Sequence, residues 1–435
     1  MKRRLTAAVG AAITMAMVSG LSACGSGGGD NSDKAPKDRT ETLTVWLMND
    51  AESTWPELVE DVNAQFKKKY PKVKVNVQFQ QWGDKTKKLD AALGGDKFPD
   101  VVELGNTETQ TYILNGALAE VDAKDYDNSD SWIKGLEDTC TFEGKLYCVP
   151  YYAAARVAIA NNAMFEKATG SGKVPATEAG LRDALKKLEQ EYGSDKAFSP
   201  LYLPGKYWYA AMSYVTAYGG EIATYDEGAK KWKASLSSPE ARKGVKHFTD
   251  LVTTWNNADK TKDELDHANV MANKKAAMLY GNTFEVDRVI GGEQGNPELK
   301  GDVGTAVMPG PGGKPLPSLV GGSDLGVIEK SEAKDLAEDW IAMFTSEKSQ
   351  QVLAEKNILP NNTKQLEPLK KNPETAAAAK AVPDAWFTPI APGWAAVEKQ
   401  GVITTMLVDI IKGESVAAAT AKADKKIDSL INNEA

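Results

Sequence analysis

Near the start of the chain, five successive segments show regular apolar spacing. Residues 42–48 and 73–79 alternate between apolar and polar positions, as half-buried strands do. Apolar side chains recur at helical spacing in residues 55–66 and again in 83–93, and residues 99–104 form a short apolar run. Strands that alternate with helices indicate βαβ units, so the sequence predicts an α/β protein with a mostly parallel sheet.

The rest of the chain is richer in helical patterns. A stretch dense in Gly and Pro, residues 291–322, interrupts these patterns and contains one predicted strand at 303–308. The predicted helical regions are residues 181–192, 207–218, 239–255, 333–355 and 394–431. No segment of about 20–50 residues repeats, which argues against a solenoid or a propeller.

The N-terminus has the pattern of an export signal. Three basic residues at positions 2–4 precede an apolar, uncharged run at 5–20. Small residues then lead to Cys24, and this segment resembles the bacterial lipobox, in which the cysteine is acylated and becomes the mature N-terminus. We therefore expect residues 1–23 to be a lipoprotein signal peptide and Cys24 to be the lipid attachment site. The alternative is a buried N-terminal helix with a chance cysteine.

The residues after Cys24 are rich in Gly, Ser and Asp, which is typical of a flexible linker. Residues 24–41 are therefore interpreted as a tether that holds a folded domain away from the extracellular face of the cell membrane. No later run reaches the roughly 18–20 apolar residues of a spanning helix. The lipid anchor is the only membrane contact that we expect.

The net charge of the chain argues against nucleic-acid binding, and its length indicates more than one domain. The chain has 52 Lys and Arg against 60 Asp and Glu, and removal of residues 1–23 takes away three positive charges, from −8 to −11. An acidic chain is a poor candidate for binding nucleic acid, whose phosphates attract basic surfaces. About 395 residues follow the tether, which is too many for one hydrophobic core, so we expect two domains.

Two further cysteines, Cys140 and Cys148, flank a short segment with Glu143-Gly144-Lys145 at its centre. This tripeptide is typical of a tight hairpin turn, which would bring the cysteines face to face across two strands. In an exported protein the expected outcome is a disulfide. Two free buried thiols are the alternative.

Few residues support catalysis. The two histidines, His247 and His267, lie in segments predicted to be surface helices, and clustered His and Cys for zinc are absent from the sequence. Residues 321–325 nearly match a nucleophile elbow but end in Leu325 instead of Gly, and the acidic run 122–130 lacks calcium-loop spacing. We expect no metal and no cofactor. A pair of carboxylates that hydrolyses glycosides stays open, because sequence spacing does not test it.

Aromatic residues point instead to ligand binding. The chain has ten Trp and fourteen Tyr. Trp82 follows a predicted strand, Trp208 begins a predicted helix, and Trp386 and Trp394 flank a Pro-rich loop. Sugar rings stack their C–H faces on aromatic rings while their hydroxyls bond polar side chains. Taken as a set, these residues indicate carbohydrate binding, although core packing explains any single one equally well.

Several short motifs lie in a fixed order along the chain, at residues 43–46, 81–82, 89–95, 98–102, 144–152, 276–282 and 321–327. Taken in this order and spacing, they resemble the extracellular solute-binding proteins that serve ABC importers of sugars and oligosaccharides. The resemblance covers the chain from about Thr42 to the C-terminus, together with the lipoprotein leader.

The resemblance implies a two-lobe, type II periplasmic-binding-protein fold in which the lobes are discontinuous in sequence and close on a ligand around a hinge of several crossings. The implied crossings lie near Tyr151, Gly321 and Asn357. The implied N-terminal lobe is 42–150 plus 321–356, and the implied C-terminal lobe is 151–320 plus 357–435.

The resemblance also suggests ligand-binding residues. Six of them follow predicted strands, at the carboxyl ends where open α/β sheets bind ligands. These are Asn49, Asp50, Gln81, Trp82, Asn106 and Thr107. From the other lobe, the resemblance suggests Trp208, Asn282, Phe284 and Trp394, and it further suggests Tyr151, Arg156, Ser323, Asp324 and Trp386. For Arg156, a salt bridge at the hinge is the alternative.

The expected function is capture of a neutral di- or oligosaccharide by a monomeric, lipid-anchored receptor that delivers it to the permease subunits of an ABC importer. It is not expected to be an enzyme. Three alternatives stay open. They are a secreted glycoside-acting enzyme, a structural or adhesive lipoprotein, and the same fold with a peptide, polyamine or anion as its solute.

Overall fold

The computed structural model describes residues 35–263, 267–291, 294–372, 375–382 and 385–433. The predicted signal peptide, Cys24 and the first part of the predicted tether lie outside these residues. Within them, none of the helices combines the length and the apolar character that a membrane crossing requires.

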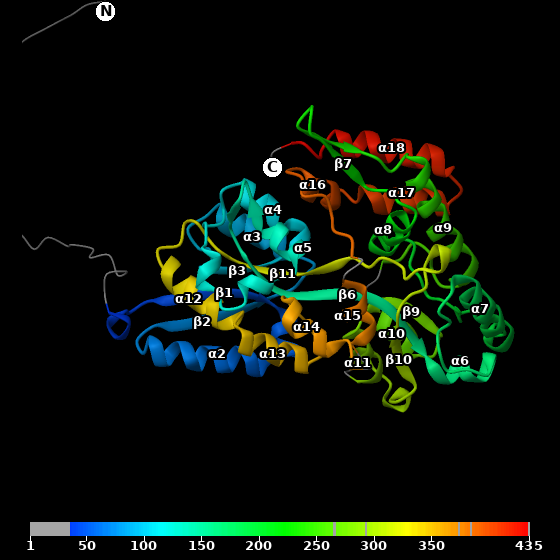
Figure 1. Cartoon of the computed structure of the whole chain (residues 1–435), viewed down its shortest axis with the longest axis horizontal. Coiled ribbons are helices and arrows are strands. Elements are labelled where there is room, and N and C mark those ends of the chain that lie inside the picture. Colours follow the sequence, from blue (N-terminus) through cyan, green and yellow to red (C-terminus); the bar gives the residue numbers. More distant parts are fainter. Residues whose placement is uncertain (1–34, 264–266, 292–293, 373–374, 383–384, 434–435) are drawn as a thin grey trace, which may run out of the picture.

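The chain forms two lobes that lie side by side along the long axis of the molecule (Figure 1). We use "N-lobe" for the part built on β1–β3, α1–α5, α12 and α13, and "C-lobe" for the part built on α6–α11, β9, β10 and α16–α18. The N-lobe elements up to the first crossing are β1 (Thr42–Met48), α1 (Asn49–Ser53), α2 (Pro56–Lys69), β2 (Lys74–Gln80), α3 (Lys85–Leu93), β3 (Val101–Gly105), α4 (Asn106–Leu114), α5 (Lys134–Cys140), β4 (Thr141–Phe142) and β5 (Lys145–Leu146).

The chain then passes through β6 into the C-lobe. The elements from there to the next crossing are β6 (Val149–Asn161), α6 (Asn162–Thr169), α7 (Glu178–Tyr192), α8 (Trp208–Ala217), β7 (Ala223–Asp226), β8 (Lys231–Ala234), α9 (Pro239–Trp255), α10 (His267–Ala272), β9 (Met278–Asn282), α11 (Glu285–Ile290) and β10 (Val303–Ala306).

The chain returns through β11 and later crosses again. The remaining elements are β11 (Val320–Val327), α12 (Lys334–Phe344), α13 (Glu347–Glu355), β12 (Leu359–Pro360), α14 (Thr363–Leu369), α15 (Ala376–Ala381), α16 (Trp394–Lys399), α17 (Val402–Ile411) and α18 (Val416–Asp428). Short 3₁₀ helices lie at Pro36–Asp38, Ala123–Asp125, Ser129–Ser131, Pro297–Leu299 and Pro311–Gly313.

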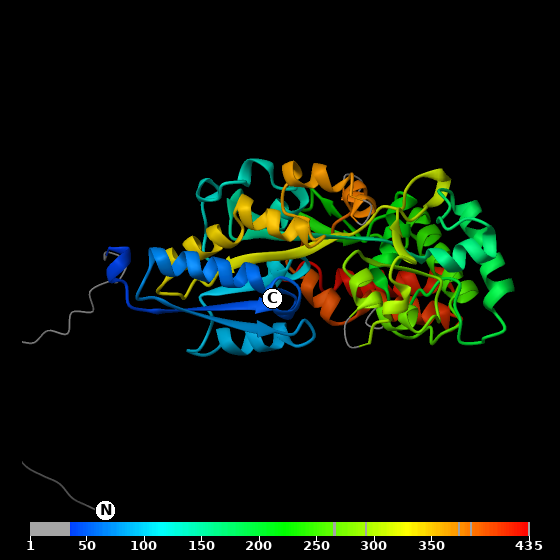
Figure 2. The same ribbon diagram turned by 90° about the horizontal axis from the view of Figure 1, so that it is seen from below.

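One sheet of the described residues runs through both lobes. Its order is β10-β6-β11-β3-β1-β2, and β9 and β12 also pair with β6. At 13 residues, β6 is long enough to serve both lobes, and it is seen crossing between them in Figures 1 and 2.

The expectation of a mostly parallel sheet is wrong. β1 is parallel to β2 and to β3, but β11 is antiparallel to β3 and β6, and β9, β10 and β12 are antiparallel to β6. The βαβ pattern is confined to the first part of the chain. The strands that link the lobes, β6 and β11, are antiparallel to each other, and β11 is antiparallel to β3. The result is a mixed sheet.

Each lobe has its own core, and a third cluster lies where they join. The N-lobe core packs α2 and α12 against β1, with Phe66 and Trp340 fully buried. The C-lobe core packs α8 against α9 and includes Tyr214 and Phe248. At the junction, α14 and α15 cover β6, with Val157 of β6 in the shared cluster. The chain therefore forms two domains, as expected from its length, and a third cluster of buried side chains joins them.

The sequence patterns located most local elements but misjudged three features. The predicted helical tail is three helices, α16 to α18, because turns interrupt it and Ser415 caps the last helix by accepting a hydrogen bond from the Ala418 amide. His247 and His267, expected on surface helices, are buried, since α9 packs on α8 and α10 lies against tyrosine rings. The end of the predicted tether is packed, because Arg39 is buried beside Asp335.

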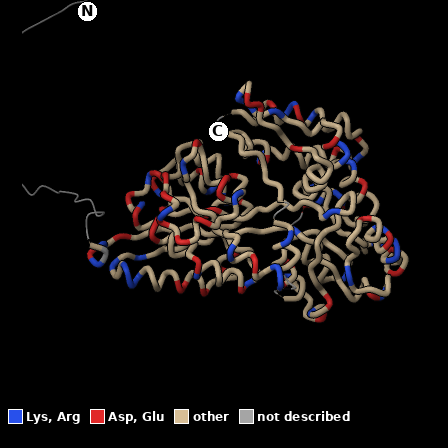
Figure 3. The backbone as a smooth tube through the Cα atoms, viewed as in Figure 1, with Lys and Arg blue, Asp and Glu red and all other residues tan. Residues whose placement is uncertain are grey.

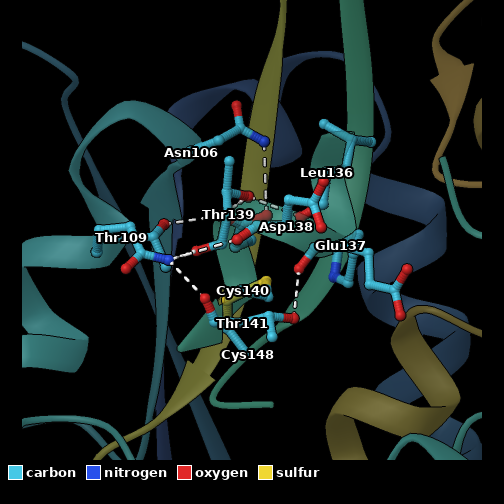
Figure 4. Close-up of a disulfide and its surroundings, with 12 residues drawn as sticks. Asn106, Thr109, Leu136, Glu137, Asp138, Thr139, Cys140, Thr141 and Cys148 are labelled. Carbon is cyan, nitrogen blue, oxygen red and sulfur yellow. Dashed lines mark hydrogen bonds between the residues drawn. A yellow bond between two sulfur atoms is a disulfide. The ribbon is translucent and has the colours of Figure 1, made fainter. Parts of the chain in front are cut away.

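The hairpin predicted between the two cysteines is confirmed. β4 pairs with β5, and Glu143 and Gly144 take φ values of 49° and 78° in the turn. Cys140 and Cys148 are joined in a disulfide, although Cys140 is the last residue of α5 and not part of a strand (Figure 4).

Candidate functional site

Three strand ends meet at one edge of the N-lobe sheet. β1 lies between β2 and β3 and is parallel to both, so their carboxyl ends point the same way. α1 begins directly after β1, Trp82 follows β2, and α4 begins directly after β3. The structure therefore brings together the six predicted residues that follow these strands, at the edge that faces the C-lobe (Figure 1).

Trp82 is held at this edge by its polar neighbours. Its Nε1 donates a hydrogen bond of 2.5 Å to Asp50 Oδ2, and Lys85 Nζ lies 4.8 Å from the ring centroid. Lys85 in turn forms an ion pair with Glu108. The indole remains 39% exposed, which is unusual for Trp and leaves a ring face available for a ligand, and Gln81 beside it is also exposed.

The C-lobe contributes a cluster of three tryptophans. The Trp208 ring centroid lies 5.8 Å from that of Trp394 and 6.3 Å from that of Trp386. Trp386 Nε1 donates to Ser213 Oγ at 3.0 Å. All three rings are at most 8% exposed, so each packs on its neighbours. The structure brings the three predicted tryptophans together.

Arg156 lies on β6 with its guanidinium enclosed by tyrosines. Its Nε donates to Tyr207 Oη at 2.6 Å, and its Cζ lies 4.3 Å from the centroid of the Tyr209 ring. Tyr209 was not predicted from the sequence, although it directly follows Trp208. The two tyrosines fix the arginine in one orientation.

Helix α16 of the C-lobe meets helix α4 of the N-lobe above the strand ends (Figure 1). Glu398 of α16 accepts a hydrogen bond of 3.0 Å from Tyr209 Oη and contacts the Thr107 hydroxyl. Burial at this contact raises the pKa of Glu398 above its ordinary value. Glu398 lies one helical turn after Trp394, and that spacing was the only sequence signal for it.

A second polar contact crosses between the lobes. Arg288 of α11 donates from Nη2 to Asp50 Oδ1 at 3.2 Å, and its Cζ lies 4.9 Å from the centroid of the Phe284 ring. Phe284 also packs against the N-lobe core. Arg288 was missed because nothing in the local pattern of α11 distinguishes it from a surface arginine.

An interlobe pocket lies beside this contact. It is small, with a cavity volume of about 30 Å³. Asp50, Trp55 and Tyr152 line it from the N-lobe side, Thr283 and Phe284 from the C-lobe side, and residues 357–359 close it.

Four predicted ligand contacts have buried polar atoms without a hydrogen-bond partner among the described residues. They are Asn49 Oδ1 in the N-lobe, Asn282 Oδ1 at the end of β9, Ser323 Oγ of β11, and Trp394 Nε1. An unsatisfied buried polar atom costs about 1–3 kcal/mol, so such atoms are rare without a reason. Similar atoms occur in the lobe cores, such as Tyr126 Oη and Trp255 Nε1, so what distinguishes these four is that they belong to predicted ligand contacts.

Three predicted contacts lie behind the cleft. Tyr151, Ser323 and Asp324 are each 0% exposed, because β6 and β11 are covered on both faces. Tyr151 Oη accepts a hydrogen bond of 2.6 Å from Trp55 Nε1 in the N-lobe core. In this structure these three residues do not reach the cleft surface.

Asp324 connects the cleft to the disulfide. Its Oδ2 lies 2.7 Å from Thr109 Oγ1 and 3.3 Å from Thr139 Oγ1, and its Oδ1 lies 3.5 Å from Asn106 Nδ2. Burial raises the pKa of Asp324 to about 7. Figure 4 shows Asn106, Thr109 and Thr139 around the Cys140–Cys148 bond.

A metal has no donor set in this region. Among the described residues, one group has the spacing of metal ligands, namely Asp324 with Cys140 and Cys148. The two sulfurs are bonded to each other, so the thiolates that a metal would require are absent.

Comparison with known proteins identifies the family that this chain matches. The model of the family described as bacterial extracellular solute-binding protein matches residues 62–384. The diacetylchitobiose binding protein DasA of Streptomyces coelicolor is 32% identical over 433 residues, which is 98% of this chain and 97% of that protein.

Solved structures share the fold. The GacH receptor of Streptomyces glaucescens, studied unliganded and with acarbose, has a TM-score of 0.74 and 22% identity, covering 91% of this chain and 100% of its own. A solute-binding protein of Thermotoga lettingae bound to α-D-tagatose has a TM-score of 0.75 and 24% identity, covering 90% of this chain and 100% of its own. These similarities confirm the two-lobe, type II fold that was predicted.

Proposed function

Because the chain belongs to the bacterial extracellular solute-binding proteins, we propose that it is the substrate-binding component of an ABC importer and captures a neutral di- or oligosaccharide between its lobes. Ligand contacts that bridge both lobes would shift an equilibrium between open and closed states toward the closed one. The closed protein would then deliver the sugar to the permease subunits. It performs no chemistry on the sugar.

The observation that carries this proposal is the set of unsatisfied buried atoms between the lobes. Asn49 Oδ1 and Asn282 Oδ1 can each accept a hydrogen bond, and Trp394 Nε1 can donate one, but none of the three has a partner among the described residues. A sugar hydroxyl both donates and accepts, so one ligand class satisfies all three. The exposed face of Trp82 provides a stacking surface for the apolar face of a sugar ring.

Charge in the cleft favours a neutral ligand. The cationic groups Lys85 and Arg288 already face the carboxylates of Glu108 and Asp50. A charged solute would have to compete with these pairs, whereas hydroxyl groups would add to them.

The name of the 32% identical relative suggests which sugars to test first. We propose an N-acetylated disaccharide, N,N′-diacetylchitobiose, as the leading candidate, beside maltose, cellobiose, trehalose and longer maltodextrins. Cellobiose is the matched control, because it is uncharged and has the same β-1,4-linked skeleton with hydroxyls in place of the two acetamido groups.

The test is titration of the protein without residues 1–24 with this panel, followed by tryptophan fluorescence and calorimetry. A saturable response to at least one saccharide supports the proposal. If no sugar up to millimolar concentration changes either signal, the proposal is wrong. Chromatography of the same mixtures tests the enzymatic alternative, which requires product to form.

We also propose the anchoring that the sequence predicts, with acylated Cys24 holding a monomer at the extracellular face of the cell membrane. The lobe boundaries 42–150 with 321–356 and 151–320 with 357–435 belong to the same proposal. Incorporation of labelled palmitate into the wild-type chain, and its loss in Cys24→Ala, tests the anchor. Light scattering of the purified protein tests the monomer.

A further inference from the structure

Asp50 uses its two carboxylate oxygens in different directions. Oδ2 accepts the hydrogen bond from Trp82 Nε1 within the N-lobe, and Oδ1 accepts the bond from Arg288 Nη2 of the C-lobe. The Asp50 side chain is 15% exposed, whereas its two partners remain partly open to solvent, Trp82 at 39% and Arg288 at 54%. One carboxylate therefore connects the Trp82 ring to the opposite lobe.

Arg288 is suited to reach across the cleft. It lies in the last turn of α11, and its guanidinium packs on the Phe284 ring of the same lobe. Stacking on an aromatic ring restricts a long side chain that would otherwise sample many rotamers. The guanidinium is thus held at the position that Asp50 meets when the lobes are together.

We propose that Arg288 is a positioning residue that couples closure of the lobes to the orientation of the Trp82 ring through Asp50. When the lobes are apart, Asp50 keeps only its own-lobe bond and its carboxylate is free to rotate. Closure brings Arg288 onto Oδ1 and locks the carboxylate, and the locked Oδ2 then fixes the indole. This inference rests on the proposed function, because it assumes that the Trp82 face receives the ligand.

Local charge supports an arginine at this position. Glu103, fully buried on β3, lies close enough to Asp50 for the two carboxyl groups to interact unfavourably. A cation arriving from the C-lobe offsets that repulsion, and only in the closed arrangement. Because the Arg288 side chain is 54% exposed, salt would screen its attraction to Asp50.

A second interlobe ion pair provides a matched control. Lys399 of α16 lies 3.8 Å from Asp90 of α3, and both side chains are at least half exposed. This pair also crosses between the lobes, but it has no contact with Trp82. Loss of either pair removes one interlobe attraction. Only loss of the Arg288–Asp50 pair should also free the Trp82 indole to change its orientation.

The test compares Arg288→Gln, Arg288→Lys and Lys399→Gln with the wild type. The measurement is the saccharide Kd at about 20 mM and about 500 mM NaCl, conditions that change screening strongly. We expect Arg288→Gln to raise Kd about three- to tenfold at low salt and to lose the salt dependence of the wild type. Arg288→Lys should recover part of the affinity, and Lys399→Gln should stay within about twofold of the wild type. Equal effects of Arg288→Gln and Lys399→Gln, or an unchanged Kd in Arg288→Gln, would overturn the inference.

A ligand-free measurement separates this inference from the proposed function. Small-angle scattering of the unliganded proteins should show a larger radius of gyration for Arg288→Gln than for the wild type at low salt, with no difference at high salt. If that difference appears but no saccharide binds the wild type, the sugar proposal fails while the interlobe contact of Arg288 stands. Identical scattering curves for the two proteins at both salt concentrations would count against the contact.

Discussion

The indole rings of Trp208 and Trp394 lie 5.8 Å apart, inclined by 57°, and Trp394 Nε1 is buried without a partner among the described residues. The two rings come from helices that are distant in sequence, α8 and α16. Trp208 is covered further by Tyr209, whose ring centroid lies 4.1 Å away. Trp394 thus has a rigid aromatic neighbour and an unused N–H, and only 2% of the residue is exposed in this arrangement of the lobes.

Replacement of the Trp394 ring should weaken sugar binding. We expect Trp394→Ala to lose about 1–3 kcal/mol of binding free energy, the scale of a stacked aromatic contact and its buried area. Trp394→Phe keeps a ring and removes the N–H, so its loss should be smaller. Calorimetric titration gives both values, and thermal unfolding identifies any variant that is misfolded. If a folded Trp394→Ala protein bound the sugar with wild-type affinity, Trp394 would not be part of the binding site.

Binding should depend on pH through Glu398. Burial between the lobes raises the pKa of Glu398, so the closed state favours its protonated form and takes up protons relative to an open, solvated state. Closure is therefore stabilised at low pH and loses this contribution as pH rises through the Glu398 pKa of the closed state. Affinity should rise as pH falls through that raised pKa toward the ordinary range of a Glu carboxyl, and Glu398→Gln should flatten the profile.

Titration in buffers of different ionisation enthalpy measures this linkage directly. The wild type should take up protons on binding, and Glu398→Gln should take up fewer. Proton release by the wild type would contradict the assignment. The groups that face Glu398 across the cleft, Lys85 and Glu108, stay in place in this variant and provide the constant background.

Folding stability should decrease with pH through Asp324. The hydroxyls of Thr109 and Thr139 each lie near a backbone carbonyl as well as Asp324 Oδ2. Each hydroxyl has a single proton, so a protonated Asp324 that donates to one of them satisfies more groups than a carboxylate does. Burial raises the pKa of Asp324 to about 7, although hydrogen bonds from the two hydroxyls to the carboxylate act to lower it.

The sign follows from linkage. The pKa of Asp324 in the folded state lies above its unfolded value, so the stabilisation is complete below pH 4 and is lost as pH rises toward 7. At about 1.4 kcal/mol per pKa unit, the loss is on the order of 4 kcal/mol. Urea unfolding between pH 4 and 8 should show this decline, and Asp324→Asn should reduce it. The pH dependence that remains in Asp324→Asn should come from Glu103. Burial raises the pKa of Glu103 to about 7 as well. A wild-type protein that becomes more stable over this range would contradict the assignment.

Local features were readable from the sequence because their causes are local. The alternation at Thr42–Met48 and the turn at Glu143 and Gly144 depend on neighbouring residues, and both elements formed as expected. The residues after β1, β2 and β3 were also placed correctly, since the ends of parallel strands must meet. Those positions make up the N-lobe half of the candidate site.

What the sequence did not reveal depends on distant partners. Arg288 contacts a residue 238 positions away, and Glu398 owes its burial to a helix of the other lobe. Tyr151 and Asp324 looked like cleft residues by position, yet β6 and β11 carry them into the covered interior of the sheet. Antiparallel pairing of these two strands is decided by how the lobes join, and no periodicity encodes it.

The disulfide should contribute measurably to stability. Cys140 and Cys148 are eight positions apart, and closing so short a loop is worth about 2.5 kcal/mol in the chain-entropy model. We expect Cys140→Ala with Cys148→Ala to lose about that free energy of unfolding. Peptide mapping without reduction tests whether the bond is present in the exported protein. Because both sulfurs are 0% exposed, a mild reductant should leave the folded wild type unchanged.

Adjacent glycines at the crossing strand should differ sharply in their tolerance of a methyl group. Gly322 of β11 pairs with Ala153 of β6 and has a φ of 144°, and a Cβ there would lie 2.0 Å from the Tyr152 carbonyl oxygen. Side chains rarely adopt that backbone conformation, and the obstructing atom is backbone in the strand that links the lobes. We expect Gly322→Ala to lower the free energy of unfolding by about 2–3 kcal/mol.

Gly321 is the matched control for this prediction. A Cβ at Gly321 meets its nearest atom at 3.9 Å, an ordinary contact, so Gly321→Ala should stay within about 0.5 kcal/mol of the wild type. Urea unfolding of the two variants gives the comparison. Because the clash lies where β6 and β11 cross between the lobes, Gly322→Ala should also disturb closure, and its saccharide affinity should fall more than that of Gly321→Ala. Two variants of equal stability would contradict the prediction, because they would show that the crossing strands yield to the added methyl group.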